Sequence, residues 1–173
     1  IGLAGSAAIT ILIAFYAISV LSFDQFHEDS DRIYFMYRDR VTESGPTPVY
    51  DTWFPMAEAA QSEFANVERS TKGLGAGQTW IKYGDKRFEQ RLFYADSSFF
   101  TFFSFSIIAG DPNSFLNDPN AVVISKEVAE KFFGDQDPMG KVLNFGFAMD
   151  RTVTGVIGEI PGNSSFEFEV VIP

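Results

Sequence analysis

At 173 residues, the chain has the length of one domain, or of one domain with an appendage, and can bury a substantial core. Its 23 acidic and 13 basic residues give a net charge of −10. This balance argues against a nucleic-acid-binding surface, because neutralising phosphates requires clustered lysine and arginine. The absence of cysteine excludes disulfides, thiolate nucleophiles and cysteine-based zinc sites.

Residues 1–23 form an uncharged apolar run, IGLAGSAAITILIAFYAISVLSF. As a helix rising about 1.5 Å per residue, this run would reach roughly 34 Å, enough for a hydrocarbon core of about 30 Å. The alternatives are a signal-peptide core, usually about 7 to 15 residues long, and a helix buried in a soluble protein. Length and lack of charge favour a transmembrane helix over residues 1–23. Because the first residue is Ile1 rather than methionine, we expect a piece of a longer protein.

An acidic cluster follows this run and contains the only histidine of the chain. The cluster comprises Asp24, Glu28, Asp29 and Asp31 beside His27. Imidazole and carboxylates can ligate a divalent cation, but one histidine with scattered carboxylates is a weak ligand set. Nor does a nucleophile elbow accompany it. We interpret the cluster as the exit from the membrane, with Phe23 and Phe26 at the interface and the acids in water.

The remaining residues predict an α+β fold, since strands and helices are interspersed without regular βαβ alternation. Strands are predicted over residues 32–41, 79–83, 87–95, 106–109, 120–124, 142–146, 151–160 and 165–172, and helices over 51–68, 96–105 and 126–133. Residues 42–50 are predicted to be a turn-rich connection. Residues 72–78 (KGLGAGQ) match no phosphate-binding motif and are predicted to be a flexible joint.

The helix over residues 126–133 has the clearest local signals. Ser125 is placed to cap its start and Gly134 to end it. An apolar side is predicted from spacing at i, i+1, i+4 and i+5: Val128, Ala129, Phe132 and Phe133. We therefore predict a scaffold helix with its aromatic side buried.

Several segments together resemble the MacB-like periplasmic core domain of FtsX-like permease subunits of bacterial ABC transporters. They are LSFDQFHEDSDRIY, YADSSFFTFFSFSIIAGDP, NAVVISKEVAEKFFGDQDPMGK and RTVTGVIGEIPGNSSFEFEVVIP. The resemblance covers most of the chain, and FFGDQDPMGK and VTGVIGEIP are its most specific parts. It implies a transmembrane helix over residues 1–23 and a core domain over residues 24–173 whose closing segment is absent. It further implies two lobes, one from residues 32–72 with 120–173 and one from about 78–112.

The resemblance also implies a location and partners. Residues 24–173 would be periplasmic, at the bacterial inner membrane. The partners would be the lipid bilayer, an ABC ATPase on a separate chain, a second permease subunit in a homodimer or heterodimer, and a periplasmic partner protein. Such a domain conveys ATP-driven movement of membrane helices to periplasmic work, such as export or lipoprotein release. We therefore expect no catalytic, cofactor-binding or metal-binding residues. The alternatives are a membrane-anchored sensor or adhesion ectodomain and, last, an extracytoplasmic enzyme.

Overall fold

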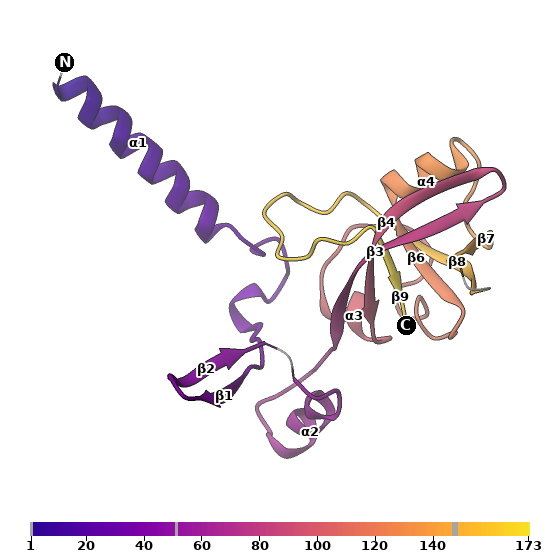
Figure 1. Cartoon of the computed structure of the whole chain (residues 1–173), viewed down its shortest axis with the longest axis horizontal. Coiled ribbons are helices and arrows are strands. Elements are labelled where there is room, and N and C mark those ends of the chain that lie inside the picture. Colours follow the sequence, from indigo (N-terminus) through magenta and orange to yellow (C-terminus); the bar gives the residue numbers. More distant parts are fainter. Residues whose placement is uncertain (1, 51, 147–148) are drawn as a thin grey trace.

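The computed structural model describes residues 2–50, 52–146 and 149–173 (Figure 1). Ile1 and Asp51, which belong to two of the predicted helices, lie outside the described residues. The helices are α1 (Gly2–Leu21), α2 (Pro55–Glu63), α3 (Phe99–Phe102) and α4 (Lys126–Phe133), with a 3₁₀ turn, η1, at Ser30–Arg32. The strands are β1 (Arg38–Thr42), β2 (Gly45–Val49), β3 (Gly73–Tyr83), β4 (Lys86–Ala95), β5 (Ile107–Ala109), β6 (Ala121–Ser125), β7 (Val142–Asn144), β8 (Asp150–Ile157) and β9 (Val170–Ile172). The mixed fold confirms the predicted α+β class.

Helix α1 projects from the rest of the chain as a single rod (Figure 1). Its stretch Ala4–Leu21 has a mean hydropathy of 2.1, and none of it is buried within the protein. Water disfavours contact with so much apolar surface. The predicted helix is confirmed, and its length and composition are those of a membrane-crossing helix.

Residues 73–173, which we call the sheet domain, hold a seven-stranded sheet with strand order β5-β8-β6-β9-β4-β3-β7. Strand β7 pairs both with β3, through Lys82 and Asn144, and with β8. The pairings therefore close a ring that runs from β8 through β6, β9, β4, β3 and β7 back to β8. Closure satisfies backbone groups that an open sheet would leave at its edges.

The central strands β6 and β9 are buried along their whole length, so they separate two cores. Val122 and Ile124 face a core that includes α4, whereas Val123 between them faces a second core of mostly phenylalanine side chains. This alternation follows from the two-residue period of a strand. The second core, which we call the phenylalanine core, contains Phe99, Phe100, Phe103, Phe105, Phe115 and Phe168.

Helix α4 agrees with its prediction residue by residue. Its bounds are Lys126–Phe133, and the Ser125 hydroxyl accepts a hydrogen bond of 3.3 Å from the Val128 amide. Gly134 has φ of 60°, the left-handed region in which a Cβ is strained. All four predicted apolar residues are buried.

The region before the sheet domain differs from its prediction. Residues 33–37 are not a strand, and residues 42–50 are not a mere connection, because β1 and β2 pair as a hairpin. Helix α2 is shorter than predicted and has no buried residue, so it does not pack on a sheet. The flanking aromatics Trp53 and Phe64 are 73% and 57% exposed. In Figure 1 the hairpin and α2 lie apart from the sheet domain.

Two predictions about organisation are wrong. Residues 73–78 are not a flexible joint but the start of β3, which pairs with the end of β4 across a bulge between Gly75 and Gln78. The predicted division into lobes also fails, because residues 78–112 supply strands of the same sheet as residues 120–173. The parallel pairing of β4 with β9, from Leu92 opposite Val170 onward, joins the two parts.

Candidate functional site

The segment that joins α1 to the sheet domain, residues 22–33, is called the neck. Helix α1 ends at Leu21, and the backbone turns at Asp24, where φ is 56°. Aspartate tolerates this left-handed conformation better than most residues because its short side chain can bond locally. The turn directs the neck onto the sheet domain instead of extending the helix.

A first set of contacts joins the neck to residues 161–166, called the clamp loop. The Asp24 amide donates to the Asn163 carbonyl at 2.9 Å, and the Asn163 side-chain amide donates to the Ser22 carbonyl at 2.7 Å. The Ser165 amide in turn donates to the Asp24 carboxylate at 2.8 Å. Three directional bonds therefore hold the end of α1 in one orientation against the clamp loop.

A second set of contacts joins the neck to the sheet domain through His27, which is only 4% exposed. Its Nδ1 accepts a hydrogen bond of 3.1 Å from the Ser104 amide, and the Ser104 hydroxyl accepts one of 3.0 Å from the Glu28 amide. The imidazole packs among four phenyl rings, with centroid distances of 4.0 to 6.3 Å: Phe26, Phe103, Phe105 and Phe166. The neck is thus anchored in the phenylalanine core. We call the neck, together with its contacts to the clamp loop and to this core, the joint.

Burial in this apolar setting lowers the pKa of His27 below its ordinary value of 6.5, and the nearby Asp24 carboxylate opposes the shift only in part. Removing an imidazolium from water costs more than removing a neutral imidazole. His27 is therefore neutral at pH 7. Because Nδ1 accepts the Ser104 amide, the proton of the neutral ring resides on Nε2.

Exposed ion pairs extend the contact between the neck and the loop that precedes β3. Arg32 lies 2.8 Å from Glu68, and Asp29 lies 3.6 Å from Arg69. All four side chains are more than half exposed, so solvent and salt screen these pairs. These ion pairs therefore stabilise the docked neck less than the clamp-loop hydrogen bonds and the buried His27 do.

The acidic cluster of the sequence therefore has two parts in the structure. Asp24 and His27 are brought together in the joint, whereas Glu28, Asp29 and Asp31 face solvent. Within residues 2–50, 52–146 and 149–173, no three histidine, aspartate or glutamate side chains gather as a metal ion would require. Phe26 was predicted to lie at the membrane interface, and in the structure its partly buried ring packs against the phenylalanine core.

Sequence reasoning missed the partners of the neck. Asn163, Ser104 and Ser165 follow it by 76 to 141 residues. Only the conspicuous run FFTFFSF around Ser104 hinted that aromatic side chains would gather there.

Comparison with known proteins agrees with this architecture. The whole chain, residues 1–173, matches the MacB-like periplasmic core domain. The chain belongs to this family. It is therefore a periplasmic domain of a membrane permease family, preceded by an apolar helix, and periplasmic domains of such permeases are non-catalytic.

Two solved structures share the fold. A domain of a putative permease protein from Porphyromonas gingivalis is 27% identical, with a TM-score of 0.67, over 79% of this chain and 60% of that one. The periplasmic region of MacB from Actinobacillus actinomycetemcomitans is 16% identical, with a TM-score of 0.54, over 68% of this chain and 52% of that one. The MacB-like chain thus spans about three fifths or less of the length of these relatives. No curated protein matches it.

Proposed function

We propose that this MacB-like domain passes movement of a transmembrane helix to the periplasmic side of an ABC transporter permease. Residues 1–23 span the inner membrane, and residues 24–173 lie in the periplasm. The observation that carries the proposal is the joint: three hydrogen bonds to the clamp loop and a buried histidine leave α1 little freedom to turn without the sheet domain. A lever needs such a rigid joint, whereas a flexible tether would dissipate the motion.

The energy for this movement would come from an ABC ATPase on a separate chain. That ATPase would bind the cytoplasmic side of a homodimeric or heterodimeric permease in the lipid bilayer. On the periplasmic side, a partner protein would receive the motion, and the work done would be export, lipoprotein release or mechanical regulation. Family membership supports the permease context, since domains of this fold occur in permeases.

Distance measurements test the rigidity of the joint. The chain contains no cysteine, so Ser19→Cys in α1 and Gln136→Cys after α4 allow two spin labels to be attached specifically. In the permease reconstituted with its ATPase, with labelled subunits diluted by unlabelled ones, we expect one narrow distance distribution between the two labels of a subunit, with and without ATP. Asn163→Ala, which removes the bond to the Ser22 carbonyl, should broaden it.

The matched control is Asn117→Ala, which removes a bond of 3.2 Å to the Asn113 carbonyl far from the joint and should leave the distribution narrow. A dye on Gln136→Cys and an acceptor in the lipid then report the height of the sheet domain above the bilayer. We expect ATP to change this height. A broad distribution in the parent protein, or a height that ATP leaves unchanged, would contradict the proposal.

A further inference from the structure

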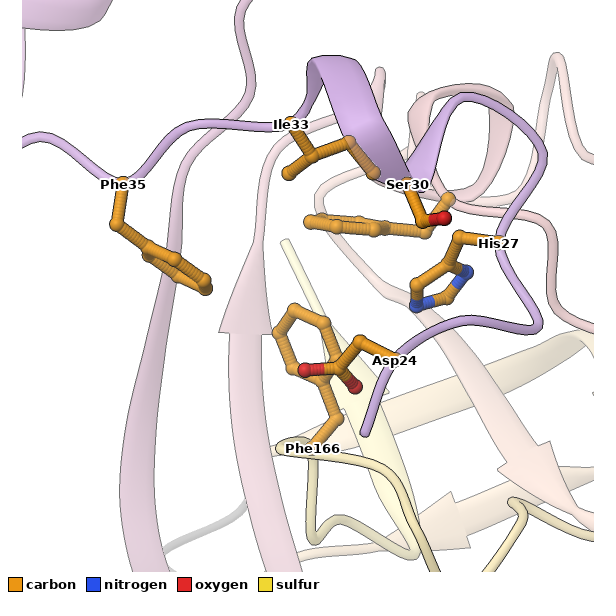
Figure 2. Close-up of a pocket in the computed structure, with 7 residues that line it drawn as sticks. Asp24, His27, Ser30, Ile33, Phe35 and Phe166 are labelled. Atoms are coloured by element: carbon orange, nitrogen blue, oxygen red, sulfur yellow. The ribbon is translucent and has the colours of Figure 1, made fainter. Parts of the chain in front are cut away.

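A cavity of about 170 Å³ lies inside the joint, and the contacts described above do not fill it. Asp24, His27 and Ser30 form its polar wall, and its apolar walls are formed by Ile33, Phe35, Phe103 and Phe166. Figure 2 shows the imidazole and the carboxylate on neighbouring sides of this space. The volume far exceeds the share of about 30 Å³ that one water molecule occupies in the liquid, so it accommodates a larger group.

His27, which lines this cavity, has an unused hydrogen-bond donor. Its Nε2 is buried and has no partner among the described protein atoms. The Ser104 amide occupies Nδ1, which makes Nε2 the nitrogen that carries the proton. Because buried polar groups are almost always hydrogen-bonded, this N–H calls for an oxygen acceptor from water or from a ligand.

Asp24 brings a negative charge to the same space. The Ser165 amide fixes one carboxylate oxygen at 2.8 Å, which holds the carboxylate beside the cavity. No lysine or arginine is among the described residues that line the cavity, so the carboxylate has no cationic partner there. The phenyl rings of Phe35, Phe103 and Phe166 add to the attraction for a cation, because the face of an aromatic ring carries negative potential.

We propose that the cavity binds a primary ammonium group linked through a short chain to an anionic or ester oxygen, as in aminoethyl phosphate. The ammonium donates to the Asp24 carboxylate and lies against the phenyl rings. The oxygen accepts from Nε2 of His27. A primary ammonium suits the site better than a trimethylammonium, because only the former can donate hydrogen bonds to the carboxylate.

The position of the cavity favours a phospholipid head group as the source of this chemistry. Asp24 follows the end of α1 by three residues, which is the level of the head groups if α1 spans the bilayer. The lipid source therefore rests on the membrane placement proposed above. A free aminoethyl phosphate needs no such placement, so the two sources are separable by experiment.

The test uses the whole chain in lipid nanodiscs, with ¹⁵N in the imidazole of its single histidine. Nanodiscs of phosphatidylcholine alone serve as the reference, and phosphatidylethanolamine is then introduced in steps. We expect a saturable shift of the Nε2 resonance of His27 as the phosphatidylethanolamine content rises. O-phosphoethanolamine, titrated into the phosphatidylcholine nanodiscs, probes the free form of the ligand.

Two variants decide whether the response comes from this cavity. Asp24→Asn removes the charge but keeps an oxygen for the Ser165 amide, and it should weaken the response about tenfold, equal to about 1.4 kcal/mol of binding free energy. Glu28→Gln removes an exposed neighbouring charge and should change nothing. A response to O-phosphoethanolamine alone would support the site with a free ligand and would leave the lever proposal untouched. No response to either probe, or an unchanged response in Asp24→Asn, would overturn the inference.

Discussion

Acidification should loosen the joint, because His27 holds the neck only in its neutral form. A protonated Nδ1 would carry a hydrogen and could not accept the Ser104 amide. Asp24 is the charged group that faces the imidazole from the neck itself. The groups packed against the imidazole from the sheet domain are uncharged: Ser104, Phe103, Phe105 and Phe166. The Asp24 carboxylate favours protonation, but burial prevails and lowers the pKa of His27.

The sign and size of the effect follow from this direction. The docked state has the lower pKa, so the undocked neck binds more protons as the pH falls below 6.5. The contribution of His27 to the free energy of docking is therefore fully present above pH 6.5. It decreases as the pH falls below 6.5 and stops decreasing once the pH is below the pKa of the docked state. One pKa unit corresponds to about 1.4 kcal/mol, so the loss between pH 7.5 and pH 5.5 reaches at most about 1.4 kcal/mol, or about tenfold in population.

Hydrogen exchange at the Ser104 amide measures this loss directly, because exchange requires the neck to open. After correction for the intrinsic rate, the protection factor should fall by up to about tenfold between pH 7.5 and pH 5.5. Ordinary carboxylates titrate near pH 4, below this window. His27→Asn offers an amide oxygen in place of Nδ1 and cannot titrate, so its protection should be independent of pH. A pH-independent protection factor in the parent protein, or an equal slope in His27→Asn, would refute the reasoning.

Three further predictions concern stability and insertion. Gln90→Leu should raise the free energy of unfolding by about 1 kcal/mol in denaturant titrations, because the buried amide has no partner among the described residues; a clear loss would reveal one. Phe132→Ala should lower it by about 3 to 5 kcal/mol, whereas the exposed Phe64→Ala should change it by less than about 0.5 kcal/mol; equal effects would contradict the described core. Ile13→Arg should reduce membrane insertion by about 2.5 to 3.5 kcal/mol in a glycosylation-based insertion assay, and unimpaired insertion would exclude a spanning α1.

The elements that the sequence predicts best are those whose signals are local. Ser125, Gly134 and the apolar spacing between them define α4 without reference to any distant residue. The start of β3 could not be predicted in this way, since its glycines suggested a flexible linker. Gly73 lies against the ring of Phe93 on β4, where a Cβ would collide with the ring, so close packing between strands requires glycine there.

The joint could be predicted only in part, for the same reason. The sequence marked Asp24 and His27 as unusual, because they follow a long uncharged run. Their roles depend on Ser104, which lies between α3 and β5, and on the clamp loop, which lies between β8 and β9. The positions of both are set by the fold of the sheet domain. The burial of a single histidine cannot be predicted from the sequence, because it depends on residues that only the fold brings close.

The long sequence separation within the joint also sets the order of assembly. Asn163 and Ser165 are synthesised 141 residues after the neck residues they bind. Because synthesis proceeds from the N-terminus, α1 is made before the clamp loop. Its contacts with the clamp loop can form only after the strands that flank this loop have been made. Until then the hydrogen bonds between the neck and the clamp loop cannot form. Completion of the sheet is thus the step after which α1 can be held in one orientation against the sheet domain.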